Sequence, residues 1–296
     1  MLDKQFNLDY IDTSNTNNEF FHIIKDFDKI NIKEIKPTIE NISEYIYEGD
    51  LSIVIDELVN LIFVKINEGK NEKMIKLFVL NYINSNEIIP QEIHNWLLNN
   101  QNNSNSIYLL GYFYYNGIGT DLNKQKAIQL CQKAADLDNR VAQIDLANVY
   151  LLGKGVDKNY KLAFELSKKL ADGEFVSGIN NLGYCYNWGI GTDVNKQKAF
   201  ELYQKAADLE NLTGINNLGW CYEKGIGTNV DKQKTFELYQ KAANLGSDIA
   251  QYNLAYMYEI GDGIKKDMDK AIYWYKKSAE QGDEIAQSKL EELLEK

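Results

Sequence analysis

The chain has 296 residues, of which 44% are apolar and 12% aromatic, and this composition supports a hydrophobic core and argues against a disordered chain. The formal charge of −11 is unevenly placed: Asp and Glu outnumber Lys and Arg by 17 to 9 in residues 1–100, and by 26 to 23 in the rest. Phosphate contacts need clustered basic side chains, so the charge argues against nucleic acid as a partner.

Cysteine usage and targeting signals indicate a soluble protein of a reducing compartment. The three cysteines, Cys131, Cys185 and Cys221, show no CxxC or Cys/His spacing, which argues against disulfides and a zinc site. The N-terminus has no basic stretch followed by an apolar one, and the longest apolar segment, residues 51–64, is short and interrupted by charges. We therefore expect a cytoplasmic protein with no membrane contact, no metal and no cofactor.

The first hundred residues predict an acidic helical module. Residues 1–18 are rich in Asn and Asp and are expected to fray. Apolar patterns after them predict helices near residues 19–33, 37–48, 51–67, 71–84 and 90–101. An Asn-rich join follows at 99–105. We therefore divide the chain into an N-terminal module, residues 1–103, and a repeat array, residues 104–296.

A 36-residue repeat runs through five units of the second part without an insertion. A leucine, a tyrosine, two glycines and an alanine each recur at this interval. The recurring residues are Leu110, Leu146, Leu182, Leu218 and Leu254; Tyr114, Tyr150, Tyr186, Tyr222 and Tyr258; Gly117, Gly153, Gly189, Gly225 and Gly261; Gly119, Gly155, Gly191, Gly227 and Gly263; and Ala135, Ala171, Ala207, Ala243 and Ala279.

Each unit predicts two short helices joined by a glycine-containing turn. In the first unit Ile107, Leu110 and Tyr114 fall on one face of a helix. That helix ends at Gly117, because glycine adopts the left-handed conformation of a C-terminal cap. Asn123 precedes the second helix and is expected to cap its first turn. The equivalent capping residues are Asn159, Asn195, Asp231 and Asp267.

One such helix pair cannot bury both of its faces, so neighbouring units must stack. We predict an all-α fold: a right-handed α-solenoid of five 36-residue helix-turn-helix repeats, preceded by the N-terminal helical module. First helices are expected to line the concave side and second helices the convex side. Residues 284–296 begin a sixth unit but turn charged, as expected of a closing helix that keeps the array soluble.

The repeat resembles the Sel-one-like repeat (SLR), a relative of the tetratricopeptide repeat with a Gly-x-Gly loop and a pair of alanines. The unit at residues 248–283 carries the resemblance most fully, and the likeness extends over roughly residues 104–290. The second unit departs most, with Leu162 for lysine and Leu170 for the first alanine, but keeps both glycines. The resemblance implies a scaffold or adaptor, often in signalling or protein quality control.

The N-terminal part is similar to the connectors of fungal SLR proteins whose repeats follow a protein-kinase-like domain. The similarity rests on Asn, Ile and Lys usage and on the junction from Trp96 to Asn100. No kinase motif is present: the sequence has no glycine-rich loop on a strand, no HRD and no DFG. This resemblance therefore implies a regulatory arm without its catalytic domain.

Three features that invite a chemical reading are better explained by structure. A phosphate loop needs a preceding strand and a third glycine, whereas the Gly-x-Gly pair recurs in every unit at a predicted helix–helix turn. His22 and His94 have no Cys or carboxylate at metal or nucleophile spacing. Cys185 and Cys221 share a repeat position, and stacked helices place such residues about 8–10 Å apart, too far for a disulfide. We predict buried, inert thiols and no catalytic, cofactor-binding or metal residue.

One surface is left as a candidate for function. Tyr112, Tyr184, Trp220 and Tyr256 share a repeat position, with Asn148 in the second unit. We call them the aromatic row, and a helical wheel directs it into the concave groove. The predicted groove residues are Tyr108, Tyr112, Tyr115, Ile144, Asn148, Leu151, Asn180, Tyr184, Asn187, Asn216, Trp220, Glu223, Tyr252, Tyr256 and Glu259. Rings and amides together suit protein recognition, but the rings of adjacent units can instead stack and brace the superhelix.

These observations predict a non-catalytic protein–protein interaction scaffold or adaptor that binds a peptide or protein segment in the groove. One alternative is a regulatory arm of a kinase-like signalling protein that lacks its catalytic domain. Another is an enzyme acting on a small molecule, although no acid–base pair or nucleophile stands out. The sequence leaves open the partner, the oligomeric state and whether the N-terminal module packs on the groove.

Overall fold

The computed structural model describes residues 48–153 and 157–294. The predicted fraying of residues 1–18, the predicted helices before residue 48 and His22 lie outside the described residues. Within the described ranges the chain is all-helical, with no strand. The prediction of an all-α fold is confirmed.

In the part of the chain that the structure describes, three helices of the predicted N-terminal module precede the repeats. They are α2 (Glu48–Glu68), α3 (Glu72–Ser85) and α4 (Pro90–Asn99). Their bounds agree within a few residues with the helices predicted near 51–67, 71–84 and 90–101. The turn between α2 and α3 contains Gly69, whose φ of +81° lies in the left-handed region that glycine accepts without strain.

The repeats form five pairs of 13-residue helices, followed by a closing helix. The pairs are α5 (Ser104–Asn116) with α6 (Lys124–Asp136), α7 (Arg140–Leu152) with α8 (Tyr160–Asp172), α9 (Val176–Trp188) with α10 (Lys196–Asp208), α11 (Leu212–Lys224) with α12 (Lys232–Asn244), and α13 (Asp248–Ile260) with α14 (Met268–Glu280); the closing helix is α15 (Glu284–Leu294).

The helix ends are formed by the residues that the repeat predicts. Gly117 and its four equivalents have φ between 64° and 78°, and each donates its backbone N–H to the last turn of a first helix. The Asn123 side chain accepts a hydrogen bond from the Lys126 backbone N–H. The other four predicted caps do the same for the third residue of their helices. Each loop therefore stops one helix and starts the next through local contacts.

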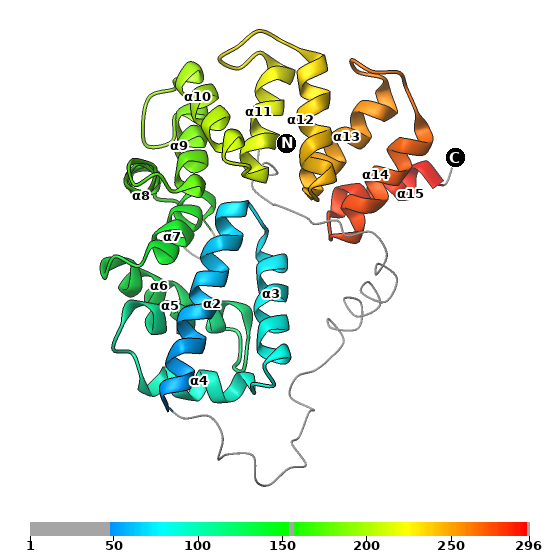
Figure 1. Cartoon of the computed structure of the whole chain (residues 1–296). Coiled ribbons are helices and arrows are strands. Elements are labelled where there is room, and N and C mark those ends of the chain that lie inside the picture. Colours follow the sequence, from blue (N-terminus) through cyan, green and yellow to red (C-terminus); the bar gives the residue numbers. More distant parts are fainter. Residues whose placement is uncertain (1–47, 154–156, 295–296) are drawn as a thin grey trace.

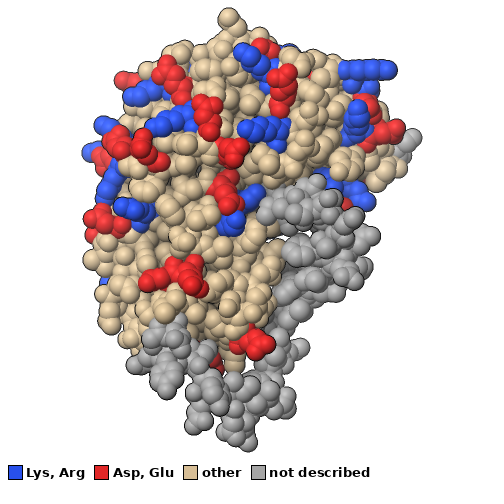
Figure 2. Space-filling view, in the orientation of Figure 1, with Lys and Arg blue, Asp and Glu red and all other residues tan. Residues whose placement is uncertain are grey.

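The helix pairs follow one another along an arc, and α2 and α3 lie on its inner side (Figure 1). First helices face this side, because α2 contacts α5, α7 and α9. Over the repeats, acidic and basic side chains are interspersed on the face that Figure 2 shows, with no extended field of one sign. The array is thus a solenoid of helix-turn-helix repeats whose concave side is partly filled from within the chain.

Helix α4 takes the place of a second helix in front of the first repeat. Gly119 approaches the Pro90 carbonyl, and in the third to fifth repeats Gly191, Gly227 and Gly263 approach the preceding second helix in the same way. The His94 ring lies edge-on to Tyr114, with centroids 5.2 Å apart. The same ring geometry recurs in Phe164–Tyr186, Phe200–Tyr222 and Phe236–Tyr258. Helix α4 starts 34 rather than 36 residues before α6, so its sequence does not follow the 36-residue period.

The described part of the N-terminal module shares one hydrophobic core with the first two repeats. This core joins Leu58 and Ile62 of α2 and Ile93 of α4 to Leu110 and Leu146 of the repeats. A second core holds the third to fifth repeats together and extends to Ala286 of the closing helix. The N-terminal helices are therefore integral to the first half of the array.

Candidate functional site

The predicted groove residues all lie on the first helices, α5, α7, α9, α11 and α13, but their exposure differs. Six are buried: Tyr108, Ile144, Leu151, Asn180, Asn187 and Asn216. Eight are half-buried: Tyr112, Tyr115, Asn148, Tyr184, Trp220, Glu223, Tyr252 and Glu259. Tyr256 is 45% exposed. The set thus divides into residues that are buried between the helices and residues that keep part of their side chain exposed.

The buried asparagines link consecutive repeats in a ladder of side-chain amides. Asn217 donates to the Asn180 side-chain oxygen at 2.9 Å, and Asn253 donates to that of Asn216 at 3.0 Å. Each bond joins a residue to the one 37 positions later. In the second repeat the apolar Ile144 cannot accept a hydrogen bond, and Asn181 of the third repeat donates instead to the side-chain oxygen of Asn148 at 2.8 Å. Asn180 and Asn216 therefore contribute their amide oxygens to stacking.

We expect the substitution Asn217→Ala to lower the free energy of unfolding by about 2 kcal/mol, because it leaves the buried Asn180 oxygen without its donor. Urea unfolding followed by circular dichroism measures this loss. Asn244→Ala, at an exposed position of α12, is the matched control and should change the stability by less than about 0.5 kcal/mol. Equal effects of the two substitutions would contradict a structural role for the ladder.

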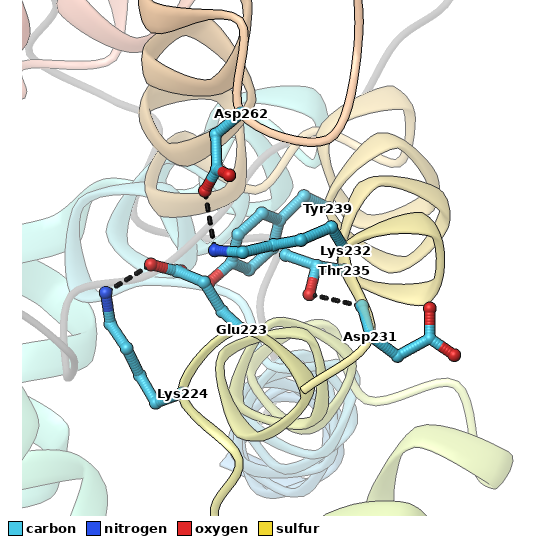
Figure 3. Close-up of polar contacts among 7 residues, drawn as sticks. All are labelled: Glu223, Lys224, Asp231, Lys232, Thr235, Tyr239 and Asp262. Carbon is cyan, nitrogen blue, oxygen red and sulfur yellow. Dashed lines mark hydrogen bonds and ion pairs between the residues drawn. The ribbon is translucent and has the colours of Figure 1, made fainter. Parts of the chain in front are cut away.

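One repeat position joins the two helices within a repeat. It is occupied by Tyr115, Leu151, Asn187, Glu223 and Glu259. Glu223 accepts a hydrogen bond from the buried Tyr239 hydroxyl at 2.8 Å, and Glu259 accepts one from Tyr275 at 2.7 Å. Figure 3 shows Glu223 also paired with Lys224, and beside them Lys232, which reaches Asp262 in the loop of the next repeat at 2.6 Å. Both glutamates keep partly exposed carboxylates at the groove.

The third and fourth repeats carry a continuous aromatic cluster, formed by Tyr184, Trp188 and Trp220. The centroid of Trp188 lies 6.2 Å from that of Tyr184 and 5.7 Å from that of Trp220. Lys196 places its ammonium 5.1 Å from the Trp188 ring, and burial lowers the pKa of this lysine. The sequence prediction missed Trp188, because the equivalent residues of the other repeats are not aromatic and no column of rings revealed it.

The N-terminal half of the concave side is covered by α2. Asn67 accepts a hydrogen bond from the Ser177 backbone N–H at 3.3 Å, and its own backbone carbonyl accepts one from the Asn211 side chain at 2.9 Å. Phe63 stands edge-on to Phe175, with centroids 5.7 Å apart. Helix α2 of the N-terminal module therefore packs on the concave side, a point that the sequence left open. It lies over the first three repeats and reaches the residue that caps the first helix of the fourth.

The residues with an apparent chemical motif have structural environments. The Gly-x-Gly loops lie at helix–helix turns. Cys185 and Cys221 are free and buried, and burial raises the pKa of each thiol to about 12. His94 is buried, and burial, followed by the Lys126 charge, lowers its pKa. Across residues 48–153 and 157–294 no three His, Cys, Asp or Glu side chains are grouped as a metal site requires. The helices in these ranges are too short or too polar to cross a bilayer.

Comparisons with known proteins agree with this architecture. The model of the Sel1 repeat family matches residues 104–139, 140–174, 176–211, 213–247 and 248–283. A Sel1 repeat protein from Oxalobacter formigenes is 30% identical and has a TM-score of 0.57, over 70% of this chain and 83% of that chain. A protective antigen of uropathogenic Escherichia coli strains with an SLR fold is 25% identical and has a TM-score of 0.51, over 85% of this chain and 60% of that chain.

No curated protein matches the chain. The family model, however, accounts for all five units in consecutive order, and these units make up more than half of the chain. Because the helix bounds, the glycine caps and the stacking of the units all follow the same repeat, the chain belongs to the Sel1 repeat family.

Proposed function

We propose that the protein is a non-catalytic scaffold that binds a segment of a partner protein along the concave surface of its third to fifth repeats. Sel1-repeat proteins are generally protein-interaction scaffolds without enzymatic activity. The observation that carries the proposal for this chain is the aromatic surface formed by Tyr184, Trp188, Trp220 and Tyr256. Large rings of this kind supply most of the binding energy at protein interfaces.

The location of the proposed binding surface follows from the part of the concave side that α2 and α3 cover. Helix α2 contacts the first helices of the first three repeats. Farther along the array, the N-terminal module reaches the N-terminal end of α11 at Gly69 and the turn before α15 at Lys73. Trp220 remains half-buried and Tyr256 is 45% exposed on the middle turns of α11 and α13. The second half of the groove is therefore the part with accessible rings.

The polar groups beside these rings favour a protein segment with hydrogen-bond donors. Glu223 and Glu259 keep 20% and 16% of their side-chain surface exposed. Carboxylates at the edge of an aromatic surface can accept bonds from backbone amides or from basic side chains of a partner. The proposed binding mode combines ring contacts along the row with a few directed polar contacts at its edge.

The substitution of Trp220 and Tyr184 by alanine should abolish partner capture, because it removes two of the three rings of the aromatic cluster. Affinity purification from the native cell identifies proteins retained by the unaltered chain, and titration with the purified partner should show an affinity loss of at least about a hundredfold. The helical circular dichroism signal and the melting temperature should remain nearly unchanged.

Tyr273→Ala is the matched control, because Tyr273 is 52% exposed on the second helix α14. It should leave partner affinity unchanged. Collapse of folding in the double variant would show that the rings brace the superhelix, and normal binding by a folded double variant would overturn the proposal. The resemblance to kinase-associated connectors stays a prediction, and a thermal shift induced by ATP would contradict the non-catalytic assignment.

A further inference from the structure

A cavity of about 140 Å³ lies between the N-terminal helices and the concave side of the first repeats. Ile62 and Ile66 of α2 and Ile75 of α3 line it from one side, and residues of α5, α6, α7, α9 and α11 line it from the other. In Figure 1 helix α2 runs along the inner side of the array, next to α3 and facing α5 and α7. An engineered cavity of about 150 Å³ holds benzene, so this one has room for one small ring.

Three tyrosines of α5, Tyr108, Tyr112 and Tyr115, line the cavity. The rings of Tyr108 and Tyr112 have centroids 6.3 Å apart and are tilted by 41°. The Tyr112 hydroxyl is buried at the cavity wall and has no hydrogen-bond partner among the described residues. Buried polar groups nearly always have a partner, and the faces of tyrosine rings attract cations. The wall is thus aromatic and has one hydroxyl available to a bound molecule.

At this cavity the second repeat has Asp145 at a position that belongs to the amide ladder in later repeats. The equivalent residues of the next three repeats are asparagines, Asn181, Asn217 and Asn253. Asp145 accepts a hydrogen bond from the Tyr108 hydroxyl at 2.8 Å, and an asparagine side chain can accept the same bond through its oxygen. Relative to the repeat pattern, the second unit therefore places a carboxylate at the cavity wall where the next three units have an amide.

Among the described residues that line the cavity, carboxylates outnumber ammonium groups. Two carboxylates, Asp145 and Glu72, line it against one ammonium, Lys70. Burial and then the charges of Asp145 and Glu72 raise the pKa of Tyr112 well above its ordinary value. Burial and the same two charges raise the pKa of Tyr115 to about 12. Both rings therefore experience a negative field from the carboxylates.

We propose that this cavity binds a small organic ammonium ion whose apolar body is the size of one ring. The isoleucines of α2 and α3 would contact the apolar body, and the tyrosine faces and the Asp145 carboxylate would stabilise the cationic group. A neutral molecule of the same shape would gain the apolar contacts alone. An anionic one would meet the two carboxylates and be repelled. The cavity lies under α2 and extends to Asn180 of α9 and Thr213 of α11, but it is not lined by Tyr184, Trp188, Trp220 or Tyr256. Its ligand therefore does not depend on the function proposed for those rings.

The test is isothermal titration of the full chain at pH 7 with benzylamine, benzyl alcohol and benzoate, which share a ring and differ in charge. Benzylammonium should bind at least about tenfold more tightly than benzyl alcohol, and benzoate should give no binding heat. Equal affinity for the amine and the alcohol would overturn the assignment of a cation. Absence of binding by all three probes would overturn the site itself.

Asp145→Asn tests the charge without disturbing the fold, because asparagine occupies this position in the following three repeats. It should weaken benzylammonium binding at least about tenfold and leave benzyl alcohol binding unchanged. Tyr112→Phe keeps the ring and should weaken benzylammonium binding about threefold. Asp172→Asn, at an exposed end of α8, should have no effect. Unchanged affinity in the folded Asp145→Asn variant would locate binding elsewhere and overturn the proposal.

Discussion

Gly227→Ala should destabilise the protein far more than Gly225→Ala, although the two glycines lie in the same loop and have similar backbone conformations. Their φ angles are 65° and 69°, so an alanine at either position costs about 1 kcal/mol in left-handed strain. They differ in what a Cβ atom would meet. At Gly225 the nearest atom is a Val230 side-chain carbon at 3.2 Å, whereas at Gly227 it is the Lys196 carbonyl oxygen at 2.4 Å.

The Gly227 contact joins neighbouring repeats, because Lys196 begins the second helix of the preceding unit. A backbone carbonyl in a helix cannot move without separating the two units. We therefore expect Gly227→Ala to lower the free energy of unfolding by about 3 kcal/mol or more, against about 1 kcal/mol for Gly225→Ala. Urea unfolding gives both values, and hydrogen exchange should show the extra loss at α10 and α11. Similar losses for the two variants would mean that the close approach is unimportant.

Truncation of Tyr239 should have the second large effect. Tyr239 is 1% exposed. Its ring packs so closely against α11 that a Cβ atom added at Gly219 would lie 2.8 Å from a ring carbon. Its hydroxyl donates to Glu223, and burial and then this carboxylate raise its pKa well above the ordinary value, so the hydroxyl remains a proton donor. Ring and hydroxyl together join α11 to α12.

Two substitutions separate these contributions. Tyr239→Phe removes the hydroxyl alone and should cost about 1.5 kcal/mol, as expected of a hydrogen bond to a charged group. Tyr239→Ala also removes the ring, leaves a cavity beside Gly219 and should cost about 4 kcal/mol. Thermal and urea unfolding of both variants measures the difference. A loss in Tyr239→Phe as large as that in Tyr239→Ala would show that the hydrogen bond, and not ring packing, joins the helices.

The candidate binding surface could be predicted only in part from the sequence. The repeat placed the aromatic row on the first helices, and the structure has those residues there. Burial was not predictable for Asn180 and Asn216, because it depends on a hydrogen bond to the next repeat. The helical wheel of a single unit contains no information on that bond. Trp188 was missed because the residues at the same position of the other repeats are not aromatic. Its role depends on contacts with rings from two units.

The sequence by itself determined what depends on contacts within one unit or between identical neighbours. Three such features are local: a glycine at the end of a helix, a capping side chain before the next helix, and an apolar helix face. Their repetition makes them recognisable in the sequence. The tertiary structure decided what depends on residues far apart and unlike one another. Helix α4 replaces a second helix without sharing the 36-residue period. Asn67 reaches Ser177 and Asn211 across more than a hundred residues. Such contacts depend on the shapes and the polar groups of two surfaces that lie far apart in the sequence. Only the folded chain therefore reveals which half of the groove is covered.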